Sequence, residues 1–431
     1  MTRQMHFGIF MLGTGNHTAG WRYPGADDSF IDLAVNQRIA ATAERGLFDL
    51  IFVGDGLSAN LASHPSYTVR LEPVTMLASL AMTTSHIGLG ATMSTTYSDP
   101  YTVARAFASL DHISNGRAAW NMVTTAAQAS GGNFGQKHPD HEQRYERAEE
   151  FIEVVKGLWD CWDDDAIIRD RATGRYLDPT KIRALNHEGK YFSVRGPMNM
   201  ARSPQGQPVI LQAGGSERGQ DLAARSADVV FSVVQDFFEA KVAYAGLKER
   251  VRRYGRDPEK VRILPGVMPI VGETDAHAFE VLGTLQGYLN STEGLAVLSA
   301  RLGVDVSKYS LDGPMPDFSL PDTSHGFARA MLSKARRDNM SLRDLYNLTA
   351  AARGHWVLCG SAKKIADTFE QWFVEHAADG FNVMPAYFPG AFDAFVDQVV
   401  PELQRRGLFR KAYSGIMLRD HLGLERPDLR S

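Results

Sequence analysis

FDLIFVG, residues 48–54, is a short apolar run with the length of a single β-strand. The chain after it turns polar and then carries apolar side chains at a helical period over Pro73–Met82. The next apolar run, Ile87–Ser94, repeats this arrangement. Strands that are apolar along nearly their whole length and separated by helices are typical of a parallel sheet buried on both faces. This stretch therefore predicts an α/β fold.

The same alternation of strand and helix runs through the rest of the chain. The other strand-like runs are His6–Leu12, Arg117–Thr125, Pro208–Ala213, Asp228–Val234, Arg262–Val271 and Gly380–Tyr387. The other helical segments are Ile31–Glu44, Val103–Ile113, Tyr145–Trp159, Arg218–Arg225, Glu239–Tyr254, Lys364–Ala377 and Phe392–Arg405. An open doubly wound sheet is compatible with this alternation, but eight regular units favour closure into a (β/α)8 TIM barrel.

Two stretches interrupt the regular units. One, at about 163–196, is polar and follows the fourth strand; the other, at about 290–353, follows the seventh strand and is rich in Gly, Asp, Ser and Met. Loops of this length are usually functional or disordered, and in a barrel they cover the mouth. We predict a single barrel domain over residues 1–431 with these two insertions and a C-terminal extension at about 408–431.

Composition excludes several classes of protein. The net charge of −4 gives no electrostatic basis for binding nucleic acid or an anionic membrane, and no apolar run reaches the length of a membrane span. The two cysteines, Cys161 and Cys359, are far apart, which excludes a disulfide scaffold and zinc sites built on paired cysteines. The first residues lack the apolar core of a secretory signal, so we expect a cytoplasmic protein.

Polar side chains stand where the predicted strands end, which is where barrel enzymes place their active sites. Asp55 follows the second strand, Thr92 lies at the end of the third, and Asn121 and Thr125 lie at the end of the fourth. A buried carboxylate must find hydrogen-bond donors or a cation, so Asp55 either caps a loop or orients a ligand. Hydroxyls and an amide around one mouth suit a neutral hydrogen-bonding ligand such as a flavin ring better than a bare metal ion.

A glycine-rich turn follows the fifth strand at Gln212–Gly219, where Ala213, Gly214, Gly215 and Ser216 lead into a helix. Glycines allow close backbone approach, and a helix that begins after them presents free N–H groups to an anion. The turn is either a phosphate seat or a tight turn with an ordinary cap. It is not a Walker loop, because no Gly-Lys-Ser/Thr follows.

Three histidines raise further alternatives. His141 lies four residues before Tyr145, so on a helix both project from one face; they either grip a phosphate or ring edge or only satisfy local hydrogen bonds. His138 with Asp140 and His141 hints at a metal, but strand one lacks a His-x-His pair and we predict no metal. His17 ends a weak, truncated dinucleotide fingerprint that no helix follows, so it is either a loop residue or a substrate contact.

Several motifs together are similar to one known family. The matching stretches are Gly46–Asp55, Ser94–Tyr97, Pro100–Tyr101, Ser109–Arg117, Trp120–Thr124, Asn133–Gly135, His141–Tyr145, Gly189–Phe192, Gln212–Gly219 and Val399–Leu408. With these motifs the chain resembles the bacterial-luciferase-like flavin monooxygenases. It resembles in particular the branch that holds the nitrilotriacetate, dibenzothiophene-sulfone, dimethyl-sulfide and long-chain alkane monooxygenases.

The resemblance implies a barrel enzyme that uses dioxygen and reduced FMN, delivered by a separate NAD(P)H-dependent flavin reductase, to oxygenate a small organic substrate at sulfur, nitrogen or carbon. It also implies a homodimer or homotetramer. Around the flavin ring and ribityl chain it places Asp55, Thr92, Asn121 and Thr125. On the phosphate side it places His141, Tyr145, Ala213, Gly214, Gly215 and Ser216. We take His17 as the candidate on the substrate side.

Two departures concern the substrate. Thr124 and Thr125 are followed by Ala126-Ala127 where the alkane-oxidising member has a histidine, and residues 292–308 lack another histidine expected there. The departures put alkane oxidation in doubt and leave the flavin assignment intact. Three alternatives stay open: a catalytically silent flavin-binding subunit, a deazaflavin-dependent oxidoreductase of the same superfamily, and a metal-dependent hydrolase.

Overall fold

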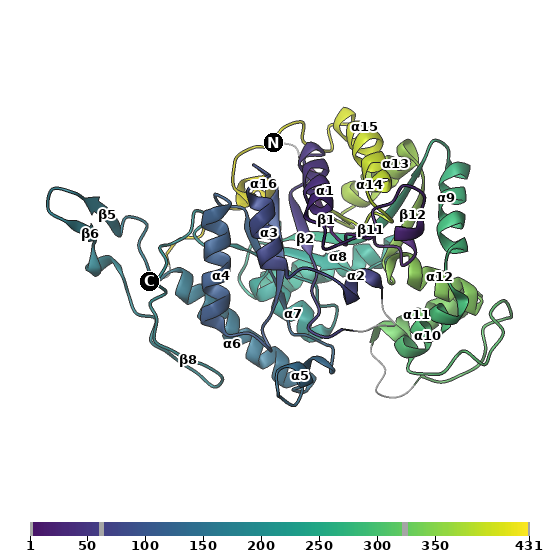
Figure 1. The fold of residues 1–431 in the computed structure, drawn as a ribbon, viewed down its shortest axis with the longest axis horizontal. Helices are drawn as coiled ribbons and strands as arrows, with labels where there is room; N and C mark the ends of the chain where they lie inside the picture. The colour runs from purple at the N-terminus through teal and green to yellow at the C-terminus, as the bar shows by residue number, and fades with distance from the viewer. Residues whose placement is uncertain (1–2, 60–63, 321–325, 430–431) are drawn as a thin grey trace.

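A computed structural model describes residues 3–59, 64–320 and 326–429. Within these ranges eight parallel strands form a closed barrel (Figure 1). They are β1 (His6–Phe10), β2 (Leu50–Val53), β3 (Gly88–Ser94), β4 (Ala118–Val123), β9 (Val209–Gln212), β10 (Val229–Ser232), β11 (Arg262–Gly272) and β13 (Gly380–Val383). The ring closes because His6 of β1 lies opposite Gly380 of β13, and Val229 of β10 opposite Arg262 of β11. The predicted (β/α)8 barrel is confirmed.

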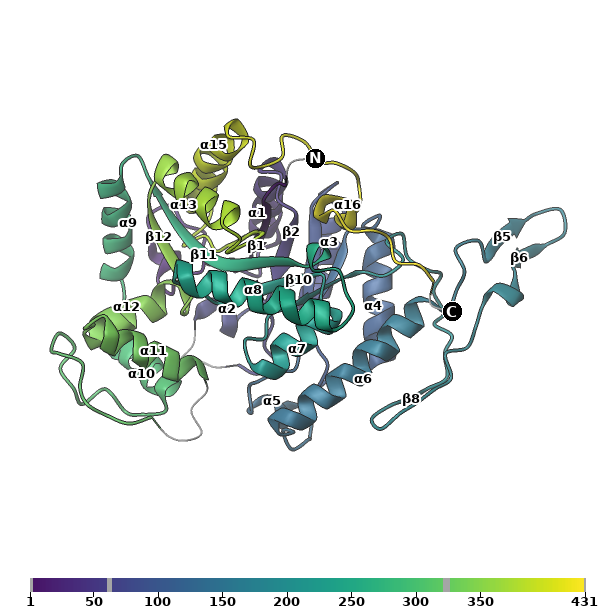
Figure 2. The ribbon, with the colours of Figure 1, turned by 180° about the vertical axis from the view of Figure 1, so that it is seen from behind.

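Helices surround the barrel on its outside (Figures 1 and 2). They are α1 (Leu33–Arg45), α3 (Pro73–Ala81), α4 (Pro100–Ile113), α6 (His141–Trp159), α7 (Glu217–Ser226), α8 (Phe237–Arg253), α13 (Ala362–Val374) and the run α14 (Gly390–Ala394), η4 (Phe395–Val399) and α15 (Val400–Arg405). Shorter helices are η1 (Gly20–Arg22), α2 (Pro65–Thr68), α5 (Ser130–Asn133), η2 (Pro179–Lys181) and η3 (Pro258–Lys260). Acidic caps start many of them; Asp99 accepts the N–H groups of Tyr101 and Thr102.

Strand β2 shows why the predicted runs are apolar throughout. Leu50 and Phe52 belong to the cluster inside the barrel, whereas Ile51 and Val53 belong to the cluster between the strands and the helices. Alternate side chains of a strand point to opposite faces, so both faces must be apolar where both are buried. Each fully buried large apolar side chain stabilises the fold by about 1.5–3 kcal/mol.

The insertion at 290–353 differs from the long loop that its composition indicates. It contains three helices, α10 (Ser291–Leu302), α11 (Gly326–Arg337) and α12 (Leu342–Ala352), which share a hydrophobic cluster of their own. A further helix, α9 (Asp275–Gly287), precedes them. The next strand, β12 (Trp356–Ser361), was not predicted; it pairs with β11 outside the barrel ring. Eight strands already complete the ring, so this additional strand extends the sheet from the far end of the long β11.

The insertion at 163–196 forms two hairpins, of which the first projects away from the barrel and the second is tied to α6 by hydrogen bonds to Glu150 (Figure 1). The first joins β5 (Ile167–Asp170) to β6 (Arg175–Leu177), and the second joins β7 (His187–Glu188) to β8 (Ser193–Val194). By contrast, the C-terminal extension packs on the barrel through α16 (Leu418–Leu422). Its Arg410 forms an ion pair with the buried Asp49.

Candidate active site

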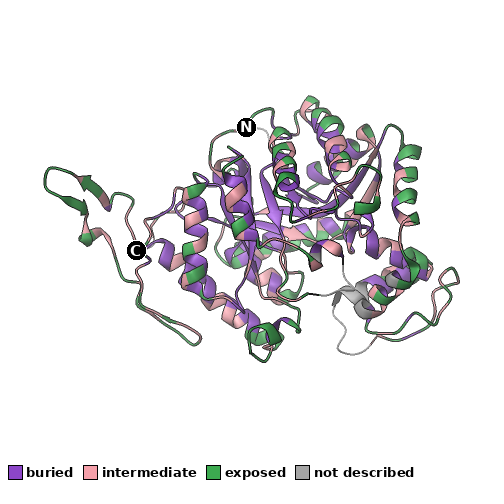
Figure 3. Ribbon diagram, viewed as in Figure 1, coloured by how far each residue is buried: buried purple, intermediate pink, exposed green. Residues whose placement is uncertain are grey.

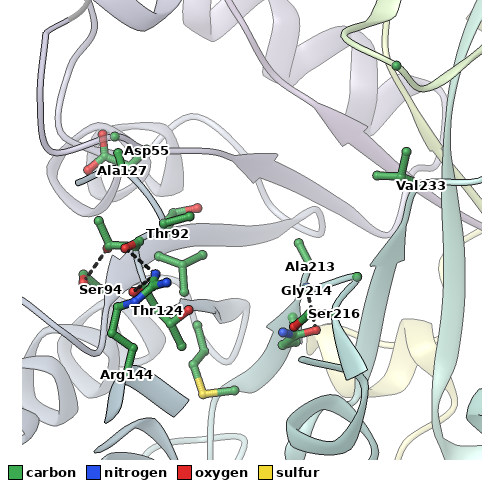
Figure 4. A pocket seen from close by; sticks show the side chains of 18 of the residues that line it. Asp55, Thr92, Ser94, Thr124, Ala127, Arg144, Ala213, Gly214, Ser216 and Val233 are labelled. Carbon is green, nitrogen blue, oxygen red and sulfur yellow. Dashed lines mark hydrogen bonds between the residues drawn. The ribbon is translucent and has the colours of Figure 1, made fainter. Parts of the chain in front are cut away.

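A cavity of about 1300 Å³ opens at the carboxyl ends of the barrel strands (Figure 4). Its walls come from the residues after β2, β3, β4, β9 and β10, and from helices α6, α8 and α11. Nine of the ten residues predicted to bind the flavin line this cavity. They are Asp55, Thr92, Thr125, His141, Tyr145, Ala213, Gly214, Gly215 and Ser216.

The glycine turn after β9 forms one side of the cavity and opens helix α7. The Ser216 hydroxyl caps the helix by accepting the Gly219 N–H at 3.1 Å, and it donates to the Tyr145 hydroxyl at 3.2 Å. A Cβ atom on Gly214 would lie 2.3 Å from Gln212 Nε2 and 3.1 Å from the Gly219 Cα, so this position requires glycine. The free N–H groups and the positive end of the α7 dipole favour an anion here.

Helix α6 places His141 and Tyr145 beside this turn. Asp140 caps the helix by accepting the Gln143 N–H at 2.9 Å, which fixes where the helix begins. The two rings then lie one turn apart, tilted by 46° and with centroids 4.8 Å from each other. The predicted i, i+4 pair is therefore presented to the same cavity as the glycine turn.

Arg144, between these two residues, was missed at the sequence level. It lines the cavity, is only 8% exposed, and donates through Nη1 to the carbonyl oxygens of Thr125 at 2.8 Å and Thr124 at 3.3 Å. In the described part of the chain no carboxylate forms an ion pair with Arg144. A nearly buried cation in the cavity wall, here on the side of Thr124, favours an anionic ligand (Figure 4). Its position between His141 and Tyr145 in the sequence was the feature that could have indicated a role in the site.

The opposite wall is built from hydroxyl groups at the ends of β3 and β4. The Thr92 hydroxyl donates to the Val53 carbonyl at 2.7 Å and accepts from Asn121 Nδ2 at 2.8 Å. Its second lone pair can therefore accept a hydrogen bond from a ligand N–H. Asn121 itself does not line the cavity; it lies behind Thr92 and fixes the direction of that hydroxyl. Its Oδ1 atom is buried with no hydrogen-bond partner among the described residues.

Thr125 and Asp55 complete this wall. Thr125 has a φ of +47°, and its hydroxyl donates to Ser94 Oγ at 2.7 Å. A threonine in the left-handed region is strained, so hydrogen bonds from Arg144 and to Ser94 hold the loop in place. Burial raises the pKa of Asp55, while the Gly56 N–H and Arg70, at 3.7 Å, oppose this rise.

His17 lies outside the lining of the cavity, in the loop after β1. It is fully buried, and burial lowers its pKa to about 3, so the imidazole is neutral near pH 7. Its Nδ1 accepts the Ala19 N–H at 3.1 Å, which leaves the proton on Nε2. That N–H donor has no hydrogen-bond partner among the residues that the structure describes.

No group of three or more His, Cys, Asp or Glu side chains in the described ranges is placed to hold a metal ion. In the same residues, no helix is both long enough and apolar enough to cross a membrane.

The fold and the cavity define a (β/α)8 barrel whose strand ends form a site suited to an anionic ligand that also carries a polar, hydrogen-bonding face. Residues 5–377 match the family described as luciferase-like monooxygenase, and the chain belongs to this family.

The relatives agree with this membership. N-acetyl-S-(2-succino)cysteine monooxygenase from Bacillus subtilis (strain 168) is 48% identical over 430 residues, covering 99% of this chain and 98% of that protein. Nitrilotriacetate monooxygenase component A from Aminobacter aminovorans is 46% identical over 444 residues, covering 99% and 97%. The solved structure of riboflavin lyase (RcaE) with modified FMN and riboflavin has a TM-score of 0.86 and 29% identity, and covers 99% and 98%. The predicted family and enzyme class, a flavin-dependent monooxygenase, are confirmed.

Proposed function

We propose that this chain is the oxygenase of a two-component system and takes reduced FMN from a separate NAD(P)H-dependent flavin reductase. When bound, reduced FMN supplies the two electrons that activate dioxygen, so that one oxygen atom enters a small organic substrate and the other leaves as water. The name of the Aminobacter relative, a component A, supports a second component. The main support for the proposal is the glycine turn at the N-terminus of α7, whose free N–H groups can bind an anion.

The residues of the cavity fit FMN. Gly215, Ser216 and the N-terminus of α7 would hold the phosphate, with Tyr145 beside it. Arg144 lies across the cavity with Thr124 and would attract the anionic ligand from there (Figure 4). Across the cavity, Thr92 offers an acceptor suited to a ring N–H, and Asn121 keeps that acceptor oriented. Both ends of FMN thus find groups of the right chemistry.

The remaining walls would receive the substrate and exclude water. Helix α11 contributes Met331, Lys334 and Arg337 to the cavity, on the side of the inserted helices. Excluding water prevents the activated oxygen from being lost as hydrogen peroxide. His17 is buried outside the lining of the cavity, and we assign it a positioning role in support of the substrate side.

We further propose that the substrate is a small thioether or amine that bears carboxylates. The two relatives above are named for such compounds: one is a succinylated cysteine and the other is an amine with three acetate groups. Lys334 and Arg337 at the cavity wall would favour anionic substrates, although Asp338 and Glu239 partly neutralise them. Oxygenation beside sulfur or nitrogen leads to cleavage of the C–S or C–N bond.

An anaerobic titration with reduced FMN and with reduced riboflavin, which lacks the phosphate, tests the flavin assignment. We expect FMN to bind at least 10-fold more tightly, because each hydrogen bond to a charged group contributes about 1.5–3 kcal/mol. Arg144→Ala should reduce this difference, because it removes a cation from the cavity wall, and should leave riboflavin binding unchanged. Arg105→Ala, at an exposed position on α4, is the matched control. Equal binding of the two flavins would refute the phosphate seat.

Oxygen consumption with a flavin reductase then tests the activity. Nitrilotriacetate and N-acetyl-S-(2-succino)cysteine should each be compared with an alkane and with a sulfone, and oxygen uptake should be matched to product. Flavin binding without turnover of any substrate by the isolated chain would favour the silent-subunit alternative. Binding of a deazaflavin in preference to FMN would favour the dehydrogenase alternative.

A further inference from the structure

Tyr97 connects the cavity to a loop on the surface. It lines the cavity and is only 8% exposed, and its hydroxyl lies 2.7 Å from Nδ1 of His138. His138 is half-buried in the loop between α5 and α6, directly after residues 132–137, which are exposed (Figure 3). Because His138 is outside the lining of the cavity, this hydrogen bond joins a group inside the cavity to a group near the solvent.

The surroundings of the Tyr97 ring hold it in one position. Phe134 stacks on it, with ring centroids 4.7 Å apart and an angle of 17° between the planes, and Ser94 Oγ accepts the Tyr97 N–H at 3.1 Å. A Cβ atom on Gly131 would lie 3.3 Å from the Tyr97 hydroxyl and 3.1 Å from the backbone nitrogen of His138, so glycine lets the loop approach this closely. The local packing therefore fixes the contact between Tyr97 and His138.

Both partners have the protonation state that a proton relay needs. Burial raises the pKa of the Tyr97 hydroxyl, although Arg144 opposes the rise, so the phenol keeps its proton near pH 7. Burial and the charge of Arg144 lower the pKa of the His138 imidazole, so the imidazole is neutral at this pH. A phenol hydroxyl and a neutral imidazole each offer a donor and an acceptor, so a proton can enter at Nε2 of His138 and another can leave from the Tyr97 oxygen.

Under the proposed function the second oxygen atom of dioxygen leaves as water, inside a cavity that excludes bulk water, so a proton must be delivered to it. We propose that Tyr97 donates this proton and that His138 replaces it from the solvent, an inference that rests on the proposed function. The O–H bond of Tyr97 breaks as a new O–H bond forms on the leaving oxygen atom. The proton on Nδ1 of His138 moves to the Tyr97 oxygen, and a solvent proton binds Nε2. Reduced FMN supplies the electrons, so neither residue is oxidised or reduced.

The hydroxyl groups at the ends of β3 and β4 lack such a connection to the solvent. Thr92 donates to the Val53 carbonyl, and Thr125 donates to Ser94, which is itself buried. Among the described residues neither bond leads to a titratable group, so a proton lost from either threonine is not replaced along it. Arg144 also lines this wall, but a guanidinium does not release its proton near neutral pH.

Tyr97→Phe tests the donor, because it keeps the ring that stacks on Phe134 and removes only the hydroxyl. A positioned general acid contributes about 10²–10⁴-fold, so we expect product formation with the reductase present to fall at least 10-fold while reduced FMN still binds. Tyr191→Phe is the matched control. It removes a hydroxyl that donates to Glu146 at 2.8 Å, outside the lining of the cavity, and should keep the wild-type rate.

Chemical rescue separates proton transfer from a structural role of His138. His138→Ala should lose activity in the same way, and imidazole added to the buffer should restore part of it, because the loop before His138 is exposed. Imidazole should leave Tyr97→Phe unchanged, since the phenol hydroxyl is still missing. His112→Ala, which removes a half-buried histidine from α4, should keep its activity and should not respond to imidazole.

The failure of this relay and the failure of the proposed function give different results. A wild type that oxidises no substrate refutes the proposed function and the relay with it. A wild type that turns over, together with an unchanged rate in Tyr97→Phe or no rescue of His138→Ala, overturns the relay alone. Nitrogen NMR gives an answer that does not depend on turnover: the Nδ1 signal of His138 should move in Tyr97→Phe and stay in place in Tyr191→Phe. An unmoved Nδ1 signal in Tyr97→Phe would show that the two groups are not hydrogen-bonded in solution and would also overturn the relay.

Discussion

Gly214 is where the proposed phosphate seat tolerates least change. In Gly214→Ala the new Cβ would press on the Gln212 side chain and on the backbone of Gly219, so the turn must open. We expect about a 10-fold loss of FMN affinity, equal to about 1.4 kcal/mol, in an anaerobic titration. Gly246→Ala on α8, whose Cβ meets nothing within 4 Å, should bind FMN like the wild type. Unchanged affinity in Gly214→Ala would show that the turn does not contact the flavin.

His17 gives a prediction about pH. Burial lowers the pKa of His17 in the folded protein to about 3 from a usual value of 6.5. Below pH 6.5 the imidazole is therefore protonated in the unfolded state and stays neutral in the folded state. The free energy of unfolding is therefore not reduced by His17 above pH 6.5, and it falls as the pH drops from 6.5 towards 3. Between pH 6.5 and pH 5 this one residue should cost about 2 kcal/mol.

Urea denaturation at pH 7 and pH 5 measures this cost. His17→Gln keeps a hydrogen-bonding side chain that cannot titrate, so its stability should fall less between the two pH values than that of the wild type. His277→Gln, at an exposed position, is the control and should follow the wild type. A pH dependence in His17→Gln equal to the wild type would mean that His17 is already protonated in the folded protein or is exposed.

At the level of single residues, the sequence could predict the polar groups that directly follow strands. Asp55 and Thr92 reach the cavity for that reason, because the carboxyl ends of barrel strands meet at one mouth. Asn121 and Arg144 show the limit. Whether a strand-end side chain faces the cavity or supports a neighbour depends on its rotamer, and Arg144 was hidden between two residues with more familiar roles.

Among the elements, the inserted helices α10, α11 and α12 should behave as a separate cooperative unit, because they have their own hydrophobic cluster. Leu345→Ala removes a fully buried side chain from that cluster, which typically costs about 2–5 kcal/mol. We expect faster hydrogen exchange in α10 and α12 and unchanged exchange in the barrel strands. We also expect more hydrogen peroxide per substrate oxidised, since α11 of this unit lines the cavity.

The matched control for this variant is Leu77→Ala, which removes an equally buried leucine from α3 on the barrel. It should lower the melting temperature of the whole barrel. If Leu345→Ala instead speeds exchange in β2 and β3 as much as in α12, the insertion and the barrel form one cooperative unit.

The elements also show what the sequence left undetermined. The alternation of apolar strands and amphipathic helices predicted the ring, because each strand of the ring is buried on both faces. The helices of the insertion were missed because Gly, Asp and Ser are frequent between them and suggest loops. Strand β12 was missed for another reason. It pairs with the part of β11 that extends beyond the residues paired with β10 and β13, so its position depends on the length of β11.

For the whole molecule, binding of reduced FMN should stabilise the barrel, since the cavity is formed by the ends of several strands. At a free concentration 100 times its dissociation constant, a ligand that binds only the folded state adds about 2.7 kcal/mol. For a chain of 431 residues this corresponds to a rise in melting temperature of about 3 °C. Reduced riboflavin at the same concentration should give a smaller rise, because it lacks the phosphate that the α7 turn would hold.

Anaerobic calorimetric scans at increasing flavin concentration separate this specific effect from others. The rise with FMN should grow with the logarithm of concentration, as mass action requires, and should move towards the riboflavin value in Arg144→Ala. The β5–β6 hairpin contributes no residue to the cavity, so Ile168→Ser/Tyr176→Ser should respond to FMN like the wild type. An equal rise with FMN and with riboflavin would mean that the phosphate contributes nothing to binding, and would refute the phosphate site at the α7 turn.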